Sequence, residues 1–152
     1  MARFDVILSP DAAVPSSAYS QGLAFGPLVV TSGYLGTHPD GSGVVKRGFE
    51  AELKQALDNV TAVLKEAGCS WADVIRVNVS LTDIGRFSDM DRIFRNYVEP
   101  PFPTRNTIGV KELWGSRNRC LGRPFSEGMR QSACPPRAIL RLIGPSRTCL
   151  RM

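Results

Sequence analysis

The order of hydrophobic patterns along the chain predicts an α+β fold, in which a mixed β-sheet carries two helices packed on one face. Two segments, 49–67 and about 86–98, place apolar residues at the spacing of an amphipathic helix. The other apolar segments are short and rich in β-branched residues, which is typical of strands. Two helices cover only one face of such a sheet, so the second face needs a partner and self-association is expected.

Five of the short segments are expected to be strands, at 4–8, 19–25, 28–33, 74–81 and 106–110. Gly26-Pro27 separates the second from the third and predicts a β-hairpin. Segment 74–81 alternates polar with apolar residues, which indicates one buried face. The prolines in 100–103 exclude helix there and deliver an extended chain to the fifth strand.

Length and composition fit one globular domain of 152 residues with 43% hydrophobic and 22% charged residues. No apolar segment approaches membrane-spanning length. Asp5 interrupts the apolar N-terminus, so we expect a strand there and not a signal peptide. A cytoplasmic location is therefore expected. His38 is the only histidine, in a turn, and Cys120, Cys134 and Cys149 lack zinc-site spacing, so no metal site is expected.

The positive charge is concentrated at the C-terminus. Residues 115–152 carry eight Arg and one acidic residue, Glu127, whereas residues 1–114 carry 11 basic and 13 acidic residues, a net charge of −2. Residues 1–114, with this negative net charge, offer no positively charged surface for the phosphates of a nucleic acid. No specific nucleic-acid partner is therefore expected.

Arg105 follows the three prolines at the mouth of the fifth strand. A guanidinium group binds a carboxylate through two parallel hydrogen bonds, so this position suits recognition of a small carboxylate. The alternative is a surface ion pair, which is common and contributes little to stability.

Five short motifs across residues 5–113 resemble the Rid (reactive intermediate deaminase) proteins, also called the YjgF/YER057c/UK114 family. They occur in the family's order at 18–22, 30–33, 57–60, 102–105 and 107–110. The resemblance implies a chorismate-mutase-like fold and a homotrimer with its sites in clefts between subunits. It also implies hydrolysis of 2-imino acids, or their enamine tautomers, to 2-keto acids and ammonia without a cofactor.

The same resemblance implies roles for five residues. Arg105 is expected to hold the substrate carboxylate, and Tyr19 to border the imine with its phenol as a donor. Ser32 and the backbone of Gly33 are expected to line the pocket, and the backbone of Thr107 to hold substrate or water. The alternatives are a half-buried strand aromatic for Tyr19 and a strand-end turn for Ser32 and Gly33.

Residues 1–113 follow the family pattern and residues 114–152 depart from it. The family continues into a last strand inside the sheet, rich in Val, Ile and Glu, whose glutamate helps to handle the attacking water. Here an Arg- and Cys-rich segment follows, which is either a divergent tail or a translation of another reading frame; we favour the second. Segment 138–143 is expected to take the vacant strand position, without supplying a carboxylate. A second departure is Asp91, where some members carry Asn, which we interpret as a solvated helix charge.

Three functions follow from these observations. The first is the imine deaminase, and the alternative is a non-catalytic trimeric protein that binds small carboxylates. The third, an endoribonuclease or translation inhibitor, is a label of some relatives. It is disfavoured by the acidic body and by the lack of a histidine pair for acid–base work.

Overall fold

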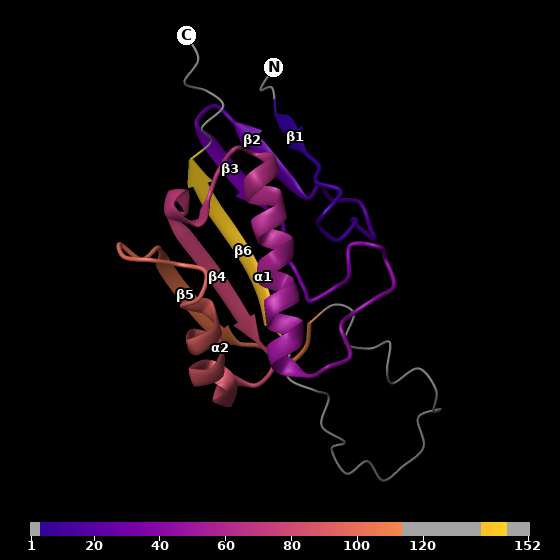
Figure 1. Cartoon of the computed structure of the whole chain (residues 1–152), viewed down its shortest axis with the longest axis vertical. Helices are drawn as coiled ribbons and strands as arrows, with labels where there is room; N and C mark the ends of the chain where they lie inside the picture. The colour runs from indigo at the N-terminus through magenta and orange to yellow at the C-terminus, as the bar shows by residue number, and fades with distance from the viewer. Residues whose placement is uncertain (1–3, 114–137, 146–152) are drawn as a thin grey trace.

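A six-stranded β-sheet runs through the computed structural model, which describes residues 4–113 and 138–145 (Figure 1). The strands are β1 Asp5–Ile7, β2 Gly22–Phe25, β3 Leu28–Thr31, β4 Arg76–Leu81, β5 Thr104–Gly109 and β6 Ala138–Pro145. The helices are α1 Phe49–Glu66 and α2 Phe87–Phe94, with short 3-10 helices η1 Trp71–Asp73 and η2 Ile84–Arg86.

The sheet is mixed, and its strand order is β1-β2-β3-β6-β4-β5. Strands β1, β2 and β3 pair antiparallel, β4 and β5 pair parallel, and β6 is antiparallel to both of its neighbours. Helices α1 and α2 contact each other and lie on the same face of the sheet (Figure 1). The predicted α+β class and the β2–β3 hairpin are therefore confirmed.

The core lies between α1 and the sheet. Helix α1 lies over β6, and its apolar face shares one hydrophobic core with the buried face of β4, as the periodicity of both segments predicts. Fully buried apolar residues from these two elements are Leu53, Ala56, Leu57, Val60, Val63, Val77, Val79 and Leu81. Burying each larger side chain of this kind contributes about 1.5–3 kcal/mol, so this layer fixes where the strand ends lie.

Two buried amides fasten the loops around the core. Gln21 accepts a hydrogen bond from Ser9 N at 2.6 Å and donates to three carbonyl oxygens of the same loop, those of Ser9, Ala12 and Ala13. Asn59, on α1, donates to the carbonyl oxygens of Leu35 and Thr37 at 3.2 and 2.8 Å. Both belong to motifs that carry the family resemblance, and both satisfy backbone groups that water does not reach.

Helix α2 is shorter than the predicted 86–98. Its regular part ends at Phe94, and residues 95–97 form a turn in which Asn96 N donates to Ile93 O at 3.1 Å and Tyr97 N to Phe94 O at 3.0 Å. These i→i+3 bonds tighten the last turn, which is a common way for an α-helix to end. The second predicted strand is also shorter, because residues 19–21 precede β2 in irregular backbone.

Strand β6 lies between β3 and β4 (Figure 1). This is the position expected for segment 138–143, and the strand extends to Pro145. Its residues are in register with Leu28–Val30 of β3 and with all of β4. The rest of the tail lies outside the described residues.

No helix in the described part of the chain is long and apolar enough to cross a membrane. Within residues 4–113 and 138–145, His, Cys, Asp and Glu do not gather in groups of three that could hold a metal ion.

Candidate active site

The Arg105 side chain rests in a cradle formed by one face of α2. We define the arginine cradle as Phe87, Asp91 and Phe94, which are four and three residues apart and therefore share a helix face. The guanidinium carbon of Arg105 lies 5.4 Å from the ring centre of Phe87 and 5.5 Å from that of Phe94. Nη1 of Arg105 lies 2.7 Å from Oδ1 of Asp91. Two cation–π contacts and one charged hydrogen bond thus orient the guanidinium before any ligand arrives.

The cradle residue Asp91 also binds a second arginine. Its Oδ2 accepts a hydrogen bond from Nε of Arg95 at 2.9 Å. The hydrogen bond from Arg105 is the main reason that the pKa of the Asp91 carboxyl lies below its usual range, partial burial opposes it, and Arg95 adds to it. Asp91 is therefore ionised at neutral pH, and the row Arg95–Asp91–Arg105 carries a net charge of +1.

A cleft of about 270 Å³ opens beside this row. Its lining joins the charged row to apolar residues of α2 and of the loop before β5, namely Phe94, Val98, Phe102 and Pro103. The Arg105 side chain keeps 21% of its surface exposed. A guanidinium carries five N–H donors, and the contact with Asp91 occupies Nη1, so donors remain for a ligand carboxylate.

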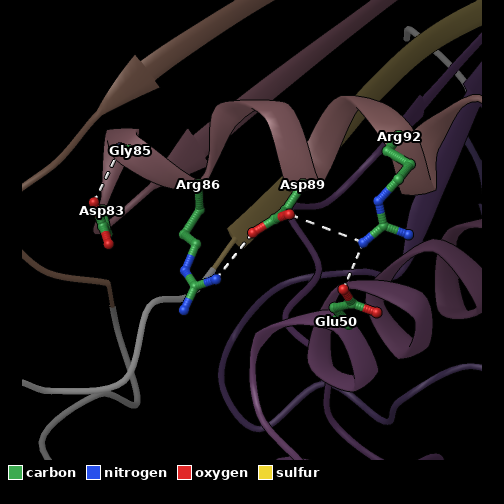
Figure 2. Close-up of polar contacts among 6 residues, drawn as sticks. All are labelled: Glu50, Asp83, Gly85, Arg86, Asp89 and Arg92. Atoms are coloured by element: carbon green, nitrogen blue, oxygen red, sulfur yellow. Dashed lines mark hydrogen bonds and ion pairs between the residues drawn. The ribbon is translucent and has the colours of Figure 1, made fainter.

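Other ion pairs near α2 are more exposed. Asp89 contacts Arg86 and Arg92, and Arg92 also contacts Glu50 of α1 (Figure 2). The Arg92 side chain is 59% exposed, nearly three times the value for Arg105. Exposed pairs contribute little to stability, so Asp89 and Arg92 serve as matched controls for Asp91 and Arg105.

Thr107 follows Arg105 on the same strand and the same sheet face. The two residues are in register with Val79 and Val77, which point into the core. The Thr107 hydroxyl oxygen is buried and has no hydrogen-bond partner among the described residues. Such an unpaired hydroxyl is unfavourable in a folded protein.

The remaining predicted site residues form a second pocket. Tyr19, Ser32 and Gly33 line a hollow of about 450 Å³ at the β2–β3 end of the sheet. The Ser32 hydroxyl donates to the carbonyl oxygen of Ser20 at 2.7 Å, and the Tyr19 hydroxyl accepts from Ser16 N at 3.4 Å. The Tyr19 side chain is 47% exposed, so its phenol is accessible to a ligand.

The two pockets are apart within one chain. Strands β6 and β4 lie between β3, which leads to Ser32, and β5, which carries Arg105. Three inter-strand steps amount to about 14 Å, too far for one small acid to contact both sides. The structure thus brings Arg105 and Thr107 together, and Tyr19, Ser32 and Gly33 together, but does not join the two groups.

Asp91 corrects one interpretation made from the sequence. It is not a solvated helix charge, because its side chain is 23% exposed and contacts Arg105 directly. The spacing of Phe87, Asp91 and Phe94 was visible in the sequence as one helix face. The contact itself needed the packing of α2 beside β5, which the sequence pattern does not specify.

Comparisons with known proteins identify the family of this chain. A sequence model of the family described as Endoribonuclease L-PSP matches residues 9–118. A RutC family protein of Aquifex aeolicus is 35% identical over 109 residues, covering 70% of this chain and 86% of that protein. A 2-iminobutanoate/2-iminopropanoate deaminase of Bos taurus is 33% identical over 108 residues, covering 71% and 79% of the two chains.

Solved structures share the fold. RidA from a Psychrobacter species has a TM-score of 0.77 at 26% identity, covering 93% of this chain and 98% of that one. The YjgF gene product from E. coli has a TM-score of 0.74 at 22% identity, covering 94% and 99%.

The mixed sheet with both helices on one face places the molecule in the class of chorismate-mutase-like α+β proteins. Within that class, the chain belongs to the Endoribonuclease L-PSP family, the Rid or YjgF/YER057c/UK114 proteins that its motifs resemble.

Proposed function

We propose that this protein hydrolyses 2-imino acids, or their enamine tautomers, to 2-keto acids and ammonia. Water adds to the imine carbon, and the carbon–nitrogen bond then breaks, so that one imine and one water give one keto acid and one ammonia. A protonated imine is already electrophilic, so positioning and proton transfer are the contributions required of the protein. Relatives of 32–35% identity that are named 2-iminobutanoate/2-iminopropanoate deaminases support this reaction.

The observation that carries the proposal is the prearranged guanidinium of Arg105. It is oriented by Asp91 and two aromatic rings, and it stays accessible beside a cleft. A substrate carboxylate bound there would fix the imine carbon at a short distance from the strand end, which is the geometry that speeds addition of water. The backbone of Thr107, two residues further on along β5, is proposed to hold the substrate or the attacking water.

A second copy of the chain is proposed to complete the site, as part of a homotrimer. Tyr19, Ser32 and Gly33 line a pocket remote from Arg105 in one chain, so they would come from a neighbouring subunit. The sheet face opposite the helices supports association, because it leaves large apolar side chains exposed. These are Val6, Phe25 and Leu28, with 66%, 51% and 42% exposure. Analytical ultracentrifugation at micromolar concentration should give the mass of a trimer, and a monomer there contradicts this arrangement.

One observation favours a second candidate function, binding of small carboxylates without turnover. Strand β6, which occupies the interior sheet position, has the sequence AILRLIGP and contains neither Asp nor Glu. The family's glutamate for the attacking water is therefore not supplied by this strand. The carboxylate site at Arg105 does not depend on it.

An activity assay tests the deaminase candidate. A serine dehydratase generates 2-aminoacrylate in place, and lactate dehydrogenase reports pyruvate as it forms. The deaminase proposal expects faster pyruvate release with the protein than with buffer, and loss of this acceleration in Arg105→Ala. Arg92→Ala removes an exposed arginine of α2 and is the matched control, expected to retain the acceleration.

Calorimetric titration with 2-oxobutanoate completes the comparison. Binding that Arg105→Ala abolishes, without any acceleration of pyruvate release, supports the binding protein and contradicts the deaminase. A folded wild-type protein that neither binds nor accelerates contradicts both.

A further inference from the structure

Asp91 contacts Arg105 and also helps to set the net charge of the candidate site. Both of its carboxylate oxygens are used, Oδ1 by Arg105 at 2.7 Å and Oδ2 by Arg95 at 2.9 Å. All three residues line the same cleft, and they are its only charged lining residues among those that the structure describes. The cleft therefore contains two positive charges with one negative charge between them.

Asp91 keeps this charge when a ligand binds. The hydrogen bond from Arg105 and the neighbouring Arg95 hold the pKa of its carboxyl below the usual range, so the group is ionised throughout the neutral range. A ligand carboxylate on Arg105 then shares the guanidinium with a carboxylate that is already bound to it. The ligand's first negative charge leaves the site near neutral.

A second negative charge on the ligand is not attracted in the same way. Once one carboxylate has bound Arg105, it neutralises the net charge of +1 on the row Arg95–Asp91–Arg105. Asp91 then repels a second anionic group within the same cleft. Unit charges a few ångströms apart near a protein surface interact strongly enough to change affinity, and like charges placed together exclude a ligand.

We propose that Asp91 is a specificity-determining residue that makes the site select acids with one carboxylate over acids with two. The inference rests on the proposed function of Arg105 as the carboxylate-binding residue. Orienting Arg105 does not by itself require a charge at position 91, because an amide oxygen in the same place accepts the same hydrogen bond, and the rings of Phe87 and Phe94 are unaffected. Asp91→Asn thus separates the charge from the contact.

The test is calorimetric titration with 2-oxobutanoate, a monocarboxylate, and 2-oxoglutarate, a dicarboxylate. The measured quantity is the ratio of their dissociation constants, because the size difference between the acids is the same for every variant. In Asp91→Asn the ratio should shift by about fivefold toward 2-oxoglutarate, as expected for loss of one partly exposed charge. Asp89→Asn removes the same charge from the same helix, away from Arg105, and should leave the ratio unchanged.

A second variant changes the ratio in the opposite direction. Arg95→Gln removes a positive charge from the cleft at a 63% exposed side chain, where the fold tolerates change, and should shift the ratio about twofold toward 2-oxobutanoate. Equal ratios in wild type, Asp91→Asn and Arg95→Gln overturn the inference, and so does an equal shift in Asp89→Asn.

The proposed function fails in a distinguishable way. If Arg105→Ala binds 2-oxobutanoate as well as wild type does, or wild type binds neither acid, Arg105 is not the carboxylate-binding residue and both proposals fall. If Arg105→Ala abolishes binding and the ratio in Asp91→Asn stays at the wild-type value, the inference about Asp91 alone is wrong.

Discussion

At the residue scale, the Arg105–Asp91 pair is the contact that links folding stability to the candidate site. Both side chains are mostly buried, and the carboxylate accepts a charged hydrogen bond of 2.7 Å. Charge-assisted bonds of this kind are stronger than exposed ion pairs because fewer water molecules compete for the two groups. Asp91 therefore contributes to stability in proportion to its ionisation.

This dependence predicts how stability changes with pH. The pKa of Asp91 is lower in the folded chain than in the unfolded chain, so its contribution is complete above the unfolded value, about 3.9, and is lost as the pH falls through the folded value. At pH 7, Asp91→Asn should lower the free energy of unfolding by about 1–2 kcal/mol. At pH 3 the difference from wild type should be smaller. Urea unfolding at both pH values measures it, and a gap that does not narrow contradicts the assignment.

A second residue-scale prediction concerns Gln21, which is 1% exposed and hydrogen-bonds to the backbone of the loop before β2 through both ends of its amide. Gln21→Ala removes the partner of Ser9 N and of the Ala12 and Ala13 carbonyl oxygens, at about 1–3 kcal/mol each where water cannot reach. The Ser9 carbonyl oxygen keeps a hydrogen bond from Ala12 N. The variant should lose at least about 3 kcal/mol in chemical unfolding. Gln55→Ala removes one bond to Asn59 at a less buried position of α1 and should lose much less.

At the element scale, the patterns that predict the helices and strands are local ones. The face of α1 and the alternation of β4 follow from spacing along the chain, so both were predictable from residues 49–67 and 74–81. The contact of Asp91 with Arg105 depends on how α2 packs beside β5, and no periodicity encodes that. Arg105 and Ser32 lie in separate pockets of one chain, so the shared site between subunits that the family motifs imply stays a prediction.

Close packing between a loop and α1 gives the element-scale prediction. A Cβ atom added at Gly36 would overlap the backbone oxygen of Glu52, so the loop that follows Ser32 and Gly33 can approach the helix only with glycine there. Gly36→Ala should destabilise the fold by about 1–3 kcal/mol through overpacking. Gly109→Ala is the control, since its nearest neighbour would be a side-chain atom of Ile84 at 3.5 Å. Thermal unfolding of the two variants measures the difference, and equal stability would show that the helix shifts without cost.

At the scale of the whole molecule, the composition of the chain changes near residue 113. The family match ends at residue 118, close to the point where lysine disappears and arginine becomes frequent. We propose that residues 114–152 are a translation of another reading frame. Reading the coding DNA in all three frames beyond Leu113 should reveal a segment rich in Val, Ile and Glu in a second frame. Its absence identifies the tail as a genuine divergent segment.

Strand β6 joins the two halves of the sheet, and its removal gives the last prediction. It pairs with β3 on one side and with all six residues of β4 on the other, so neither half of the sheet touches the other without it. A chain ending at residue 137 would leave the facing N–H and C=O groups of β3 and β4 unpaired, at about 1–3 kcal/mol for each buried group. Domains of this size are stable by about 5–15 kcal/mol, so the shortened chain should not fold cooperatively.

A chain ending at Pro145 keeps β6 and is the matched control. Circular dichroism and thermal unfolding compare the two chains, and a cooperative transition in the shorter one would mean that β3 and β4 do not need β6.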